Sequence, residues 1–328
     1  MARVLLVLFV PIFAVIAFAP LLLIDPRPLP PERRGTSPGH EGRNAVTLAS
    51  PAGKPGLELH VRDSGAEESP RRSFVLLHGF TFNLYTWDRI YDALMKHGRV
   101  IAYDQIPYGF SDKPVPGDRR EGHPYTRKAA LDRLFSLLDH YDIGRVILIG
   151  NSSGAALALE AARAQPKRIE GLVLLAPWVF SHRPSLPDWF TTTPQVRRLL
   201  LWLARELGTG MPLLDRSYHR PDRIDDQRRR LAGVHRQIEG WDMAWAALLT
   251  RSLSEPMKIG THLEEIRIPV MVIAGQADRI VPAADSLAAS RRLPMATFLG
   301  IENCGHVPQE ECPHAVTLAI DRWLRTLP

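Results

Sequence analysis

The stretch LIGNSSGAALAL, residues 148–159, decides the fold class. An apolar run leads into it and a helical pattern follows, so its pattern G-x-S-x-G lies where a strand turns sharply into a helix. Such a turn strains its central residue, Ser152, and lifts that side chain above the sheet. Ser153 begins the helix, where its backbone N–H can stabilise an oxyanion. The pattern predicts Ser152, rather than Ser153, as a nucleophile.

Apolar runs typical of strands alternate with helical patterns along the rest of the chain. After an expected antiparallel hairpin, they are SFVLLHG, VIAYD, VILIGN, GLVLLAP, VMVIAG and ATFLG, at residues 73–79, 100–104, 146–151, 171–177, 270–275 and 296–300. Between the second and third, Leu131, Leu134, Phe135 and Leu138 follow the helical spacing i, i+3, i+4 and i+7. This alternation predicts an α/β fold with a mostly parallel sheet flanked by helices.

One connection is far longer than the others. Residues 178–257 separate two strands where a β-to-α connection normally needs far fewer residues, and their content is helical and aromatic. We therefore expect an inserted helical cap at residues 178–257, and a core formed by residues 44–177 and 258–328.

A serine hydroxyl needs a base to take its proton, and that base needs an acid to orient it. Asp278 in GQADRIVP and His306 in ENCGHVP each follow a predicted strand, at the edge of the sheet where such sites lie. Serine, acid and histidine is the chain order of the α/β-hydrolase triad. We predict that Ser152, Asp278 and His306 are catalytic.

Residues 44–328 resemble the capped branch of the α/β-hydrolase superfamily, which includes esterases, lipases, C–C bond hydrolases and epoxide hydrolases. The resemblance lies in the elbow and in four further motifs, LLHGF, YDQIPYGFSDKP, GQADRIVP and CGHVPQEE. It implies an oxyanion hole formed by the backbone N–H groups of Phe80 and Ser153. It also implies that His78 braces its own loop and that the turn-stabilising residues of the second motif are Asp104, Ser111 and Asp112.

Differences from the patterns of individual subfamilies narrow the range of reactions that we expect. Epoxide hydrolases and haloalkane dehalogenases carry an aspartate nucleophile, where this chain has Ser152, and C–C hydrolases usually follow the catalytic Gly-His with tryptophan, where it has Val307. We therefore expect a serine hydrolase acting on a small-molecule ester with an apolar acyl group, without cofactor or metal. A C–C bond (vinylogous diketone) hydrolase and a non-enzymatic ligand receptor are the alternatives.

The N-terminal residues 4–24 are apolar and uncharged, long enough as a helix to cross a bilayer. They predict a single-pass membrane anchor at residues 1–24, followed by a linker at residues 25–43 rich in Pro, Gly and charge. A cleaved signal peptide and a secreted protein are the alternative, because Ala17 to Ala19 has the form of a cleavage site. Positive charges flank both ends of the segment, so the side of the membrane stays open.

The charge and the cysteine content limit which other partners we expect the protein to bind. The net charge of +6 is spread over the 328 residues without a basic stripe interleaved with aromatic residues, so we expect no nucleic-acid partner. The two cysteines, Cys304 and Cys312, exclude a cysteine zinc site and leave open whether they pair with each other. Cys304 is interpreted as a small buried residue that supports the loop of His306. The oligomeric state is also open.

Overall fold

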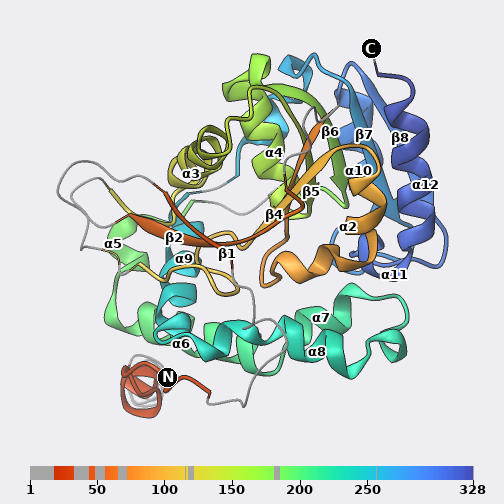
Figure 1. The fold of residues 1–328 in the computed structure, drawn as a ribbon. Coiled ribbons are helices and arrows are strands. Elements are labelled where there is room, and N and C mark those ends of the chain that lie inside the picture. The colour runs from red at the N-terminus through yellow and green to blue at the C-terminus, as the bar shows by residue number, and fades with distance from the viewer. Residues whose placement is uncertain are drawn as a thin grey trace, which may run out of the picture.

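An eight-stranded sheet forms the centre of the molecule in the computed structural model shown in Figure 1. The structure describes residues 18–32, 44–48, 56–65, 72–114, 116, 122–180, 185–255 and 257–327. The strand order is β1-β2-β4-β3-β5-β6-β7-β8. The bounds are β1 Asn44–Leu48, β2 Leu57–Asp63, β3 Ser73–Leu77, β4 Arg99–Tyr103, β5 Val146–Asn151, β6 Ile169–Leu175, β7 Val270–Gly275 and β8 Ala296–Ile301.

Strand pairing is antiparallel only where β2 meets β1 and β4, and it is parallel from β4 to β8. The parallel strands therefore end at one edge of the sheet, and the loops that follow β3, β5, β7 and β8 meet there. The prediction of an α/β fold with a mostly parallel sheet is confirmed.

Helices cover both faces of the sheet because its central strands are apolar on both sides. Along β3, Phe74 and Leu76 are buried on the face covered by α2 and α12, and Val75 and Leu77 on the opposite face. This alternation follows from the two-residue period of a strand. The helices concerned are α2 Asp88–Met95 and α12 Pro313–Leu324 on one face, and α3 Arg127–His140, α4 Ser153–Ala164 and α10 Ala283–Arg292 on the other (Figure 1).

The described residues of the long connection between β6 and β7 form five α-helices, and Figure 1 shows these helices beside one end of the sheet. We call this group the cap. Its helices are α5 Asp188–Thr191, α6 Pro194–Thr209, α7 Pro212–Ser217, α8 Asp226–Ala232 and α9 Trp241–Ser254. The apolar run of α6 buries Leu200 and Leu201, and Trp202 on its other side stays exposed. The remaining short helices are α11 Pro308–Glu311 and the 3-10 turns Leu84–Trp87, Pro166–Arg168, Pro221–Arg223, Val234–Gln237, Ile259–Thr261 and Leu263–Glu265.

The N-terminal segment differs from the sequence-based expectation. In the described part of the chain, every helix is too short or too polar to cross a membrane, so the predicted anchor and the single-pass membrane location are wrong. Of the apolar run, the structure describes residues 18–23 as helical. Residues 1–17 of that prediction and residues 33–43 of the predicted linker lie outside the described residues.

The described residues after this helix lie against the cap. The guanidinium of Arg205, in α6, donates to the carbonyl oxygens of Asp25 and Arg27 at 2.9 and 2.6 Å. The buried carboxylate of Asp242 accepts from the Leu29 N–H at 3.1 Å and from Arg205 Nε at 2.9 Å. These contacts satisfy backbone groups that would otherwise need water, and they hold residues 25–29 on α6 and α9.

Candidate active site

Ser152 occupies the sharp turn between β5 and α4. Its φ of 54° and ψ of −115° place a non-glycine residue in a strained conformation, which costs about 1–3 kcal/mol. The glycines on either side let the chain pass closely: a Cβ atom on Gly154 would lie 2.1 Å from the carbonyl oxygen of Leu77, and one on Gly150 would lie 2.6 Å from the backbone of Ala155. The surrounding sheet and helix therefore fix the Ser152 side chain at the end of the strand.

Asp278 and His306 are brought together from the loops after β7 and β8. Asp278 Oδ2 lies 2.7 Å from His306 Nδ1, and both side chains are buried. The other oxygen, Asp278 Oδ1, accepts from the backbone N–H groups of Ile280 and Val281 at 2.7 and 2.9 Å. The carboxylate is therefore oriented by its own loop, and it favours the histidine tautomer with a proton on Nδ1 and a free Nε2.

His306 and Ser152 line the same cavity, but their side chains share no hydrogen bond among the described residues. The contact between nucleophile and base is often looser before substrate binds than in the reacting complex.

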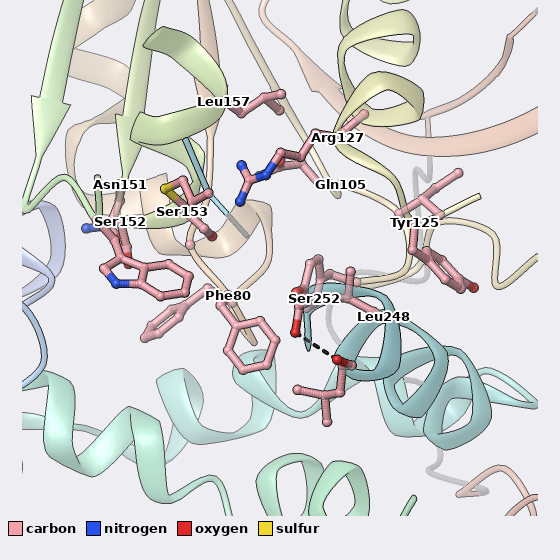
Figure 2. A pocket seen from close by; sticks show the side chains of 18 of the residues that line it. Phe80, Gln105, Tyr125, Arg127, Asn151, Ser152, Ser153, Leu157, Leu248 and Ser252 are labelled. Atoms are coloured by element: carbon pink, nitrogen blue, oxygen red, sulfur yellow. Dashed lines mark hydrogen bonds between the residues drawn. The ribbon is translucent and has the colours of Figure 1, made fainter. Parts of the chain in front are cut away.

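The predicted oxyanion donors Phe80 and Ser153 flank Ser152 in the cavity wall (Figure 2). Ser153 is the first residue of α4, where backbone N–H groups lack a helical partner. Neither the Phe80 N–H nor the Ser153 N–H donates to another described group. Both donors remain available for a charge that develops next to Ser152.

His78 holds its own loop in place, as the sequence predicts. Its Nε2 accepts from the Gln105 N–H at 2.9 Å, so Nδ1 carries the proton and donates to the Gly79 carbonyl oxygen at 2.8 Å. Burial lowers the pKa of His78 and keeps the ring neutral. A histidine with both nitrogens engaged in this way braces the loop and has no free nitrogen for catalysis.

The loop after β4 is organised around Asp104. This buried carboxylate accepts from the Leu84 and Phe110 N–H groups at 2.7 and 2.8 Å and contacts His60 Nδ1 at 2.7 Å. Burial opposes ionisation of Asp104, but these hydrogen bonds, led by that of His60, hold its pKa below the usual value. Ser111 donates to the Asp104 carbonyl oxygen at 2.6 Å, and Asp112 accepts from the Glu58 N–H at 2.8 Å. These three residues have the turn-stabilising roles that the sequence predicts.

Two glutamates join the histidine loop to the cap, and the sequence analysis missed them. The Glu311 carboxylate accepts from the N–H groups of Gly305, His219 and Arg220 at 2.7 to 2.9 Å. Glu310 accepts from Arg228 Nε at 2.7 Å and from the Tyr218 hydroxyl at 2.5 Å. We call these contacts the cap clasp.

Two further hydrogen bonds hold the backbone of His306. The His306 N–H donates to the Ser217 carbonyl oxygen at 2.6 Å, and the Asn151 side chain donates to the His306 carbonyl oxygen at 3.0 Å. The signal in the sequence was the pair of acidic residues in CGHVPQEE, but no local pattern names their partners about 90 positions away.

A disulfide joins Cys304 to Cys312 across the histidine loop, with Cα atoms 6.3 Å apart. The sequence left this pairing open. Cys304 is fully buried, two residues before His306, so it supports the loop through a covalent bond as well as by its small size. The bond closes a short ring that contains His306.

The cavity over Ser152 has a volume of about 360 Å³ and lies between the sheet edge and the cap. Apolar side chains make up much of its wall, among them Phe80, Leu157, Trp178 and Leu248. Figure 2 shows Phe80 close to Ser152 and Ser153. Such a cavity accommodates a small molecule with an apolar segment next to the reacting group. Within the described residues, no cluster of three His, Cys, Asp or Glu side chains suits a metal ion.

Comparison with known proteins identifies the family. A model of the alpha/beta hydrolase family matches residues 74–319. The chain belongs to this family. The hydrolase is 25% identical over 275 residues to the 2-hydroxy-6-oxo-2,4-heptadienoate hydrolase of Pseudomonas putida, a match that covers 78% of this chain and 88% of the relative.

Two solved structures resemble the hydrolase closely in fold. A thermophilic esterase from Thermogutta terrifontis is 26% identical, with a TM-score of 0.66 and coverage of 87% of this chain and 99% of the esterase. A meta-cleavage product hydrolase from Pseudomonas fluorescens is 21% identical, with a TM-score of 0.66 and coverage of 86% and 97%. At this identity the second likeness shows the fold alone. The relatives thus include both esterases and C–C hydrolases, and hydrolysis is the activity they share.

Proposed function

We propose that this hydrolase cleaves carboxylic esters through an acyl-enzyme formed on Ser152. One observation carries the proposal: a strained serine shares a cavity with an oriented Asp278–His306 pair and with two backbone N–H groups that donate to no other described group. Nucleophile, base and oxyanion donors are the parts that acyl transfer requires.

The proposed reaction has two steps. His306 Nε2 takes the Ser152 proton as the hydroxyl oxygen attacks the ester carbonyl, and the Phe80 and Ser153 N–H groups donate to the oxyanion. Asp278 stabilises the imidazolium, which then protonates the leaving alcohol. Water repeats the sequence, releases the acid and restores the serine.

C–C bond hydrolysis is the second candidate, because the Pseudomonas putida relative is named for that class of substrate. Two features favour the ester. The esterase likeness has the higher identity of the two structural comparisons, and Val307 follows the base where C–C hydrolases usually carry tryptophan. The apolar wall next to Ser152 suits an acyl group that is apolar beside the carbonyl carbon.

Covalent labelling tests the nucleophile. A fluorophosphonate needs an activated hydroxyl and an oxyanion hole, so it should label the wild-type protein at Ser152 in peptide mass spectrometry. Ser152→Ala should abolish labelling. Ser153→Ala is the matched control and should keep most of it, because the backbone N–H survives the substitution. A folded wild-type protein that resists the probe would favour a ligand receptor instead.

A substrate panel separates the two reaction classes. We expect release of 4-nitrophenol from 4-nitrophenyl acetate and butyrate, with a rate that falls on acidification because a protonated histidine cannot act as base. Cleavage of a vinylogous diketone without cleavage of any ester would move the assignment to C–C hydrolysis.

A further inference from the structure

The cavity over Ser152 is not apolar throughout. Five charged side chains line a second region: Arg127, Arg133, Glu160, Arg251 and Glu255. They come from α3, α4 and the end of α9, and Figure 2 shows the Arg127 side chain reaching into the cavity from α3. We call this region the charged end.

The charges at this end are partly withdrawn from water. Arg127 Nη1 lies 2.9 Å from Glu160 Oε1, with the two side chains 30% and 14% exposed. Arg251 Nε lies 3.0 Å from Glu255 Oε2, with both side chains 27% exposed. Arg251 Nη1 also lies 3.9 Å from Asp188 Oδ1. Partly buried charges are screened less than surface charges, so an anion that reaches Arg127 interacts with it more strongly than with an exposed arginine.

The charged end lies at a defined distance from the nucleophile. Glu160 follows Ser152 by eight positions, with Ser152 at the N-cap of α4, and eight residues of helix rise ~12 Å. Leu157, also on α4, lines the cavity between them. A group that touches both Ser152 and the Arg127–Glu160 pair must therefore be elongated and apolar in its middle.

We propose that the preferred ester carries a carboxylate at the far end of its acyl chain, and that Arg127 binds this carboxylate. The inference rests on the proposed function, since it concerns the same cavity and the same acyl group. An extended chain of eight carbons spans about 8–9 Å, because three backbone bonds span at most about 3.6 Å. The Arg127 side chain spans the remaining distance between the end of this chain and α3.

The Arg127 guanidinium has room for a second acceptor. It meets Glu160 through one nitrogen and one oxygen only, and among the described residues Arg127 Nε is buried without a hydrogen-bond partner. A buried donor without a partner is costly, so an acceptor that reaches it is stabilising. A carboxylate delivered by the substrate can therefore accept from Arg127 Nε while Glu160 keeps its bond to Arg127 Nη1.

Two substrates of equal length test the proposal. 4-Nitrophenyl octanoate and the mono-4-nitrophenyl ester of octanedioic acid differ only in the terminal carboxylate. We expect kcat/KM of the wild-type enzyme to be about tenfold or more higher for the carboxylate ester, the factor that one charge-assisted hydrogen bond provides. The preference should shrink as salt concentration rises. A wild-type enzyme that cleaves the octanoate ester as well or better would overturn the proposal.

Variants assign the preference to Arg127. In Arg127→Met the ratio of the two kcat/KM values should fall toward one. Lys128→Met is the matched control and should keep the wild-type ratio, because Lys128 is the next residue of α3 but is exposed and pairs with Asp132. An unchanged ratio in folded Arg127→Met would also refute the assignment. Cleavage of 4-nitrophenyl acetate by the wild-type enzyme separates this failure from failure of the proposed function.

Discussion

His235 makes the stability of the cap dependent on pH. Its ring is 2% exposed and packs against two tryptophans of α9. The ring centroid lies 4.8 Å from that of Trp241 and 4.4 Å from that of Trp245, on which it stacks. Burial lowers the pKa of His235 to about 3, whereas an unfolded histidine has a pKa of ~6.5. Below pH 6.5 the unfolded chain binds a proton that the folded chain excludes. The free energy of unfolding therefore decreases as the pH is lowered, until about pH 3.

The size of the effect follows from the pKa difference. At about 1.4 kcal/mol per pH unit, His235 alone should remove about 3 kcal/mol from the free energy of unfolding between pH 6.5 and pH 4. His235→Phe keeps an aromatic ring in the same space without a titrating group. We expect this variant to lose about 3 kcal/mol less than the wild-type protein over that range, measured by urea unfolding at both pH values.

The matched control is His314→Phe, which changes an exposed histidine and should follow the wild-type pH dependence closely. If His235→Phe and the wild-type protein lose equal stability on acidification, the argument from burial is wrong.

Three further variants probe the active site. Asp278→Asn should lower turnover by about 10⁴-fold with an unchanged circular dichroism spectrum, since an amide misorients the base; near-normal turnover would exclude Asp278 from the triad. Glu311→Gln should lower both the melting temperature and kcat, because an amide cannot accept from three N–H groups as a carboxylate does, a loss of about 1–3 kcal/mol; an unaltered melting temperature would contradict this. Gly154→Ala should destabilise the fold by about 1–3 kcal/mol or more, as seen in thermal unfolding, because its Cβ would meet the Leu77 carbonyl oxygen. Gly144→Ala, with open space around it, is its control and should be tolerated.

Local signals explain what could be predicted from the sequence. Each parallel strand is a short apolar run, and Ser152, Asp278 and His306 each stand just after such a run. The carboxyl ends of parallel strands lie at one edge of the sheet. A residue that directly follows any of these strands is therefore expected at that edge. The sheet and the neighbourhood of the three residues could therefore be inferred without any knowledge of tertiary contacts.

Contacts between distant segments explain what could not be predicted. The hydrogen bond from the Arg220 N–H to Glu311 joins residues 91 positions apart, and no periodicity or motif encodes that pairing. The Cys304–Cys312 bond depends on backbone geometry that spacing alone leaves open.

The cap clasp also decides how molecules pass in and out of the cavity. Residues 217–220 are bonded to the loop that carries His306, so raising that side of the cap would pull the base away from Ser152. At another part of the cavity, Arg127 of α3 and Arg251 of α9 are 30% and 27% exposed. In the proposed mechanism, a product that leaves past these two side chains would leave Ser152 and His306 in place for the next turnover.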